Sequence, residues 1–209
     1  MSIATSNVPA LALGAALRRW RLLHRVKQEH AAELLGVAQP TISRWESGRQ
    51  AMEPAERAKV ERIVGARLDS AADRVLALLV SESPRSVHLI CDLTHRLLAC
   101  STARANEFHV PVHDLIGQSL LRYATRKIEA EEKLLAGRGW YEQPVPAPIE
   151  FDTGENASSV VPIRQSRCRW TRLLLSDGSP ARLVETLNYS IPSIHSGASS
   201  REASRRKRA

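Results

Sequence analysis

The sequence predicts an N-terminal all-α helix-turn-helix domain followed by an α+β domain with one antiparallel sheet. In the first part, apolar residues recur at three- and four-residue spacing, as on amphipathic helices. After residues 83–84, Ser-Pro, short apolar runs alternate with turn residues, as in strands. The net charge also changes along the chain, from +5 over 1–67 to −1 over 68–189 and +4 over 190–209. We therefore expect a helical domain at 9–67, a connecting helix at 68–82, an α+β domain at 83–192 and a disordered basic tail at 193–209.

Composition narrows the class of protein. Cys91, Cys100 and Cys168 are an odd number of cysteines without CxxC spacing, which argues against a disulfide framework or a zinc site. Free cysteines fit a reducing cytosol. A signal peptide has positively charged residues before its apolar run, and the apolar run near this N-terminus has none before it, so it does not resemble one. Because there is no uncharged apolar stretch of about 18 residues, we expect a cytoplasmic protein without a membrane span.

The first two helices follow from apolar spacing. The first begins near Pro9, and its inward face is expected to hold Leu13, Ala16, Leu17, Trp20 and either Leu23 or His24. The second is expected from about Gln28 to Leu35, with an inward set of Ala31, Ala32, Leu34 and Leu35. Gly36 follows directly, where a left-handed helix C-cap needs a residue without Cβ.

Two further helices complete the first domain. A third begins near Gln39, with Pro40 in its first turn, Ile42 and Trp45 buried, and Gly48 at its end. A fourth opens at 52–54 and turns Val60, Ile63 and Val64 inward. Gly65 either ends this helix or lies within a longer one that continues to about Val80. The apolar repeat over 68–80 is either a dimer seam or a face packed on the next domain.

The second domain is predicted as strands around a group of helices. Strands are expected at 87–91 and 96–100 around a turn at 92–95. Short helices at 102–108 and 112–116 and a longer one at 124–136 follow, and then strands near 149–151, 168–175 and 181–188. This order describes helices packed against one antiparallel sheet.

The second and third helices carry side chains suited to DNA. The major groove of DNA is wide enough for one α-helix. At the start of the third helix, Gln39 offers a donor and an acceptor to adenine, and further along it Arg44 offers two donors to guanine. Thr41, Ser43 and Arg49 suit phosphate contacts. The alternative is a plain helical hairpin, in which Gln39 and Arg44 are solvated surface.

Residues 13–64 closely resemble the phage-repressor (Cro/C1, XRE) type of helix-turn-helix, which is lambda-repressor-like in fold. The pattern is met by Leu13, Gly14, Leu17, Arg21, Val26, Gln28, Ala32, Leu35, Gly36, Val37, Ile42, Ser43, Trp45, Glu46 and Gly48. The resemblance implies a recognition helix at 39–47, with Gln39, Pro40 and Arg44 facing bases. It also implies that Gln28 contacts phosphate and braces that helix, and that Arg21 pairs with Glu46.

Two residues depart from that family pattern. Lys27 replaces the Ser or Thr that usually caps the second helix, which costs roughly 1 kcal/mol. Pro40 offers a base only an apolar contact.

Residues 86–191 resemble, more distantly, the PAS sensor fold. The matching segments lie at 90–98, 114–120, 133–137 and 169–178, and the segment Ile116-Gly117-Gln118-Ser119-Leu120 is the strongest. His95 stands where a turn glycine is usual and Ser101 where an asparagine is usual. The resemblance implies a domain that binds a small-molecule ligand or cofactor, or that dimerises.

No cofactor is identified by motif. Residues 117–127 lack the cysteine of a photoactive flavin site, and 124–137 lack the histidine of a haem site, so the cofactor is unknown. His88, His95, His109 and His113 fall on different elements, where isolated histidines are usually surface or core residues. Cys91 and Cys100 are either a redox pair on neighbouring strands or packing residues, and packing is favoured.

Together these observations predict a sequence-specific transcriptional regulator that binds double-stranded DNA as a homodimer on an inverted repeat. An antitoxin-like interaction protein that autoregulates through its DNA-binding headpiece is the alternative. No peptidase, cupin, metalloprotease or phosphate-loop motif occurs, so we expect no enzyme. The basic segment 201–208 either adds non-specific phosphate contacts or only solubilises the chain.

Overall fold

The computed structural model describes residues 10–143 and 145–187. The predicted tail at 193–209 therefore lies outside the described residues. The first domain consists of α1 (Ala10–Leu23), α2 (Gln28–Leu35), α3 (Gln39–Glu46) and α4 (Pro54–Val64), which we call the headpiece. Its core is formed where α1 crosses α3, with Leu13, Leu17 and Ile42 fully buried.

The backbones of α1 and α3 come into close contact at Gly14, and this contact fixes the distance between the two helices. Gly14 lies so close to α3 that a Cβ on it would be 2.0 Å from the Trp45 carbonyl oxygen. Glycine is therefore the residue that allows this packing. Trp45 itself is 2% exposed and closes the core from the α3 side.

The short helix α2 begins and ends as its sequence predicts, with one difference on its faces. Lys27 provides no side-chain cap, and Gly36 ends the helix with φ +70°. Ala31, Ala32 and Leu35 are buried, but Leu34 is 54% exposed, so its predicted inward position is wrong. At 3.6 residues per turn, the three buried positions share a narrow arc and Leu34 lies outside it.

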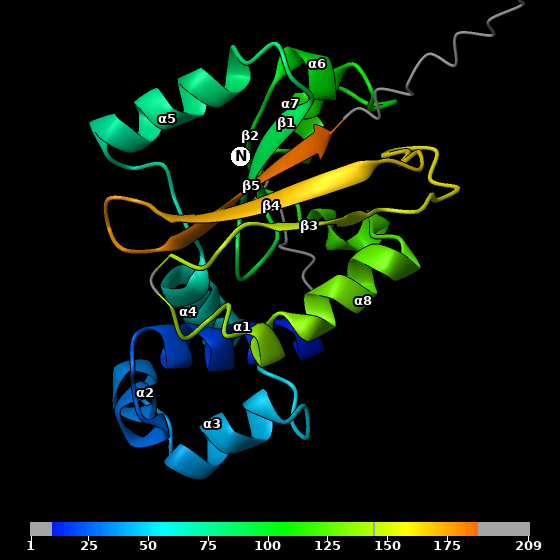
Figure 1. Cartoon of the computed structure of the whole chain (residues 1–209). Helices are drawn as coiled ribbons and strands as arrows, with labels where there is room; N and C mark the ends of the chain where they lie inside the picture. The colour runs from blue at the N-terminus through cyan, green and yellow to red at the C-terminus, as the bar shows by residue number, and fades with distance from the viewer. Residues whose placement is uncertain (1–9, 144, 188–209) are drawn as a thin grey trace, which may run out of the picture.

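Helix α5 (Ala71–Ser81) is separate from α4. The backbone of Gly65 is extended, and Ser70 caps α5 by accepting from the Asp73 N–H at 3.0 Å. Asp73 Oδ1 in turn accepts from the Ser176 backbone N–H at 3.0 Å, which ties α5 to the turn at 175–179. The helix packs on strands β1 (Val87–Cys91) and β2 (Leu97–Cys100), on the far side of the domain from the headpiece (Figure 1).

The second domain is built on one antiparallel sheet. Its strands are β1 (Val87–Cys91), β2 (Leu97–Cys100), β3 (Ile149–Asp152), β4 (Arg167–Leu174) and β5 (Pro180–Leu187), in the spatial order β2-β1-β5-β4-β3. Between β2 and β3 lie α6 (Thr102–Ala105), α7 (Val112–Leu115), the 3₁₀ turn η1 (Leu120–Tyr123), α8 (Arg126–Leu134) and the 3₁₀ turn η2 (Ala136–Arg138). The predicted order of strands and helices is confirmed.

Side-chain alternation gives the sheet two different faces. On β4, Cys168, Trp170 and Arg172 are buried, whereas Arg169 between them is partly exposed and pairs with Glu150 at 2.6 Å. The buried face of the sheet lines the domain interior. In Figure 1, α8 lies between this sheet and the headpiece, close to α1.

Candidate functional site

A chain of polar contacts joins three helices of the headpiece. Arg21 Nε and Nη2 donate to the two Glu46 carboxylate oxygens at 2.6 and 2.7 Å. Gln28 Nε2 donates to Glu46 Oε2 at 3.0 Å, and Gln39 Nε2 donates to Gln28 Oε1 at 2.6 Å. The bond to Glu46 raises the pKa of Arg21 above its ordinary value. The predicted Arg21–Glu46 pair and the bracing by Gln28 are both present.

These bonds hold the start and the end of α3 in place. Gln39 is the first residue of α3 and Glu46 the last, and both are tied to Gln28 of α2. Gln39 is therefore half-buried, with its amide N–H₂ engaged by Gln28. Its carbonyl oxygen and the second hydrogen of its amide nitrogen are the groups it has left for a base.

The other predicted DNA-contacting residues lie on the outer side of α3 and just beyond it. Pro40, Ser43, Arg44 and Arg49 are exposed, and Thr41 is half-buried. Arg44 Nη2 donates to Thr41 Oγ1 at 3.3 Å, which is a weak bond that a base or phosphate would readily replace. The structure thus gathers the predicted residues at α2, α3 and the segment just after α3, and Arg44 and Arg49 are the long donors among them that are open to solvent.

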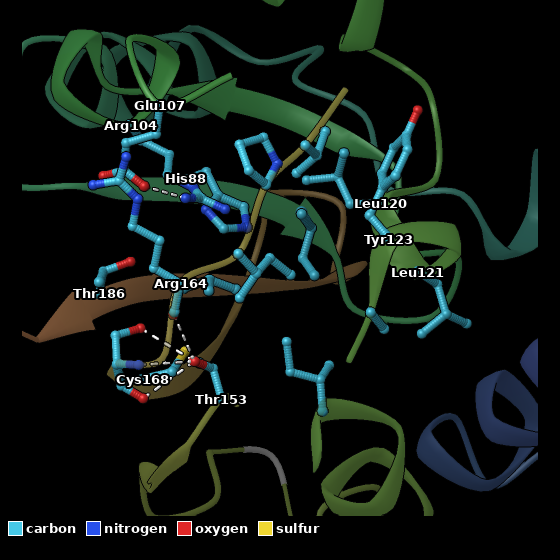
Figure 2. A pocket seen from close by; sticks show the side chains of 18 of the residues that line it. His88, Arg104, Glu107, Leu120, Leu121, Tyr123, Thr153, Arg164, Cys168 and Thr186 are labelled. Atoms are coloured by element: carbon cyan, nitrogen blue, oxygen red, sulfur yellow. Dashed lines mark hydrogen bonds and ion pairs between the residues drawn. The ribbon is translucent and has the colours of Figure 1, made fainter. Parts of the chain in front are cut away.

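A cavity of about 1050 Å³ lies inside the α+β domain. Its walls come from the buried face of the sheet, from α6, η1 and α8, and from residues 161–166. Figure 2 shows His88, Arg104 and Glu107 together at one end, with Leu120, Leu121 and Tyr123 at the other. Sequence reasoning did not find this site, because its residues come from segments far apart in the chain.

A buried ionic cluster forms one wall of the cavity. Arg182 on β5 is 1% exposed, and its guanidinium donates to Asp92 Oδ1 at 2.5 Å and to Glu132 Oε2 at 2.7 Å. His95 Nε2 lies 2.9 Å from Glu132 Oε1, and Trp140 Nε1 donates to Asp92 Oδ2 at 2.9 Å. The guanidinium also lies over the Trp170 ring at 4.3 Å.

Mutual pairing keeps this cluster charged. Burial by itself would raise the pKa of Glu132, but Arg182 and His95 hold it well below its ordinary value. Burial likewise opposes the charge on Arg182, and Asp92 and Glu132 more than compensate, which raises its pKa. Charges buried in this way are stable only as a complete set, so loss of one member destabilises the others.

The cluster also reaches the headpiece. Arg19 on α1 lies 3.4 Å from Glu132 Oε1 and stacks over the Tyr141 ring at 5.1 Å. Glu132 therefore contacts a cavity residue, Arg182, and a headpiece residue at once. A second link joins Arg96 beside β2 to Glu61 of α4 at 3.0 Å.

The histidines lie on different elements, as predicted: His88 is on β1, His95 precedes β2 and His109 precedes α7. All three nevertheless line the cavity, which the sequence did not indicate. No group of three or more His, Cys, Asp or Glu side chains in the described ranges is placed to hold a metal ion.

The three cysteines are free, and the favoured interpretation of Cys91 as a packing residue is confirmed. Cys100 lies opposite His88 in the β1–β2 register, whereas Cys91 lies at the other end of β1. Cys91 is instead a packing residue that accepts from the Ala66 N–H at 3.4 Å. Burial raises the pKa of the Cys168 thiol to about 12.

Among the residues that the structure describes, no helix combines the length and apolarity needed to cross a membrane.

Comparison with known proteins bears on both domains. Residues 12–69 match the family model described as a helix-turn-helix domain. No curated protein matches the sequence.

Similar solved structures include PAS sensor domains, the class that residues 86–191 resemble. The PAS domain of an HTR-like protein from Haloarcula marismortui is 15% identical, with a TM-score of 0.39 over 56% of this chain and 90% of that one. The PAS domain of Bordetella pertussis BvgS is 14% identical, with a TM-score of 0.36 over 55% of this chain and 83% of that one. An RNA-binding light-oxygen-voltage receptor is 9% identical, with a TM-score of 0.40 over 89% of this chain and 60% of that one.

Proposed function

We propose that this protein is a sequence-specific DNA-binding transcriptional regulator of the XRE type, with an α+β domain that senses a small molecule. The observation that carries the proposal is the braced recognition helix. Gln28 fixes both ends of α3, while Arg44 and Ser43 project to solvent from its outer side. A helix held in this way enters a major groove without first having to be ordered. The proposed role is binding in the cytoplasm, without catalysis.

The test is selection of a preferred site from a pool of random duplexes, followed by mobility-shift titration of the full chain. Arg44→Ala should weaken binding to the selected site by roughly tenfold or more, because a bidentate contact to guanine is worth about 1–3 kcal/mol. Gln39→Ala should relax base preference at one position. Arg126→Ala, an exposed arginine on α8, is the matched control and should leave binding unchanged. If neither headpiece variant alters specific binding, the assignment of α3 as the reader is wrong.

We further propose that α5 is the dimer seam. Its inner side is buried on the sheet through Asp73 and Val80, whereas Val75, Leu78 and Leu79 are 57%, 54% and 63% exposed. Residues 75, 78 and 79 follow helical spacing, so the three side chains form one apolar stripe. A second copy of the chain fits this stripe, because a two-fold axis there would also place two readers on an inverted repeat.

Sedimentation equilibrium measures whether the chain is a dimer in solution. Leu78→Asp should convert a dimer to a monomer and should reduce operator affinity in parallel. Val145→Asp is the control, because Val145 is 70% exposed and belongs to the segment before β3, not to α5. A Leu78→Asp protein that remains dimeric contradicts the assignment of the seam.

A further inference from the structure

The cavity in the α+β domain has a polar end and an apolar end, and this polarity defines a class of ligand. We propose that it binds a small organic monoanion, a carboxylate with an apolar body, whose carboxylate lies at His88 and Arg104. The inference rests on the sensing role proposed above and specifies its ligand.

The polar end holds two buried nitrogen atoms without partners. Arg104 Nε and His88 Nδ1 are both buried, and neither has a hydrogen-bond partner among the described residues. Each of the two residues is 8% exposed, and both line the cavity. Arg104 Nε–H is a donor, and His88 Nδ1 is a second donor in the Nδ1–H tautomer of its neutral ring. A buried donor without an acceptor is costly, so an oxygen acceptor placed there is favoured.

The charges at this end favour an anion. Arg104 and Arg164 supply two positive charges, and Glu107 supplies one negative charge through its bond to Arg104 Nη1. Burial and the neighbouring Arg104 lower the pKa of His88 well below its ordinary value, so the ring is neutral. These four side chains together carry a net charge of +1, which a single carboxylate neutralises. A planar guanidinium also matches a carboxylate in geometry.

The other arginine of the cavity is not available for such a ligand. Arg182 already donates to Asp92 and to both oxygens of Glu132. Glu107, by contrast, is 41% exposed in its side chain, so it can turn away from Arg104. An incoming carboxylate therefore binds at Arg104 and not at the ionic cluster.

The remainder of the ligand is apolar. Leu120, Leu121 and Tyr123 of η1 line the end opposite to His88 and Arg104 (Figure 2), and Ile128 of α8 also lines the cavity. A volume of about 1050 Å³ is more than enough for a carboxylate with a ring or a short chain.

Isothermal titration calorimetry of the full chain can distinguish recognition of the ligand's charge from recognition of its shape. The probes are 3-phenylpropanoate and octanoate, each compared with its own primary amide, which keeps the size and removes the charge. Each acid should bind at least tenfold more tightly than its amide. Binding of neither acid at millimolar concentration, or equal affinity for acid and amide, would overturn the proposal.

Three variants locate the carboxylate. Arg104→Gln should weaken acid binding at least tenfold, and Arg126→Gln should not change it. Glu107→Gln removes the competing carboxylate from an exposed position, so it should strengthen acid binding at least threefold and leave amide binding unchanged. If Arg104→Gln does not fold, the Glu107 variant decides: unchanged or weaker acid binding contradicts the proposed site.

Mobility shifts with the same preparation keep the two proposals apart. A protein that binds the acids but no DNA contradicts the regulator and leaves the ligand site standing. A protein that binds its selected DNA but none of the acids contradicts the ligand site alone.

Discussion

At the scale of single residues, one buried position in each domain restricts which side chain can stand there. Gly14 sets the approach of α1 to α3, because a Cβ there would lie 2.0 Å from a backbone oxygen that cannot move away. His88 is a neutral imidazole enclosed at the polar end of the cavity. Gly14 is restricted because there is no room for a Cβ, and His88 because burial disfavours the charged form of its ring.

Gly14→Ala is expected to destabilise the protein even though alanine favours helix. Forcing one methyl group into a packed interior typically costs about 1–3 kcal/mol. Because the contact is with backbone, we expect a value at the upper end, together with loss of the proposed DNA binding. Thermal unfolding followed by circular dichroism measures it. Gly137→Ala is the matched control, since a Cβ there meets nothing within 4 Å, and it should cost little. Equal melting temperatures for the two variants would show that α1 can move off α3.

The buried imidazole of His88 makes stability depend on pH. Its pKa is lowered in the folded state by burial and by Arg104, so the unfolded chain takes up the proton first as the pH falls. The protein should therefore lose stability below about pH 6.5, where the unfolded imidazole becomes protonated. His88→Gln should reduce this loss between pH 7.5 and 5, measured as urea midpoints. His113→Gln, on the exposed α7, controls for removal of an imidazole. A loss as large in His88→Gln as in the wild type would assign the effect to other groups.

At the scale of elements, periodicity was sufficient to predict most of the chain. It predicted α1 to α4, the order of the strands and the turn at 92–95, because each depends on local spacing. Leu34 and the stripe of Val75, Leu78 and Leu79 show its limit, since spacing identifies an apolar face without showing what covers it. The family resemblance supplied the Arg21–Glu46 pair, which spacing alone does not indicate.

One element lacks a feature that its position calls for. Helix α2 begins after Lys27, whose backbone has the extended conformation of an N-cap but whose side chain accepts no hydrogen bond. Lys27→Ser should therefore stabilise the protein by about 1 kcal/mol, because the hydroxyl accepts a backbone N–H of the first turn. Chemical denaturation compares it with Lys27→Ala, which removes the lysine without adding a cap. If serine gives no gain over alanine, the first turn of α2 already has its N–H groups satisfied by water.

At the scale of the whole molecule, the ionic cluster belongs to both domains. Asp92, Glu132 and Arg182 come from a turn, a helix and a strand of the α+β domain, and Arg19 reaches them from the headpiece. No local pattern in the sequence predicts such a cluster, because each member lies in an unremarkable local context and they meet only in the folded chain. The cavity was missed for the same reason, with Arg104 on α6 and His88 on β1.

Besides the packing of Cys91 against Ala66, two ion pairs join the domains, and these pairs can be removed without truncating an apolar core side chain. Arg19 contacts Glu132 at 3.4 Å and Arg96 contacts Glu61 at 3.0 Å, and all four side chains are partly or largely buried. With both links present, the two domains should unfold in one cooperative transition. The double variant Arg19→Gln, Arg96→Gln should unfold in two, because each domain keeps its own core but loses its tie to the other. Differential scanning calorimetry of the full chain distinguishes these outcomes. Arg126→Gln, which removes an exposed arginine outside the interface, should keep the single transition. One unchanged transition in the double variant would mean that apolar packing between the domains, and not these ion pairs, couples the headpiece to the cavity.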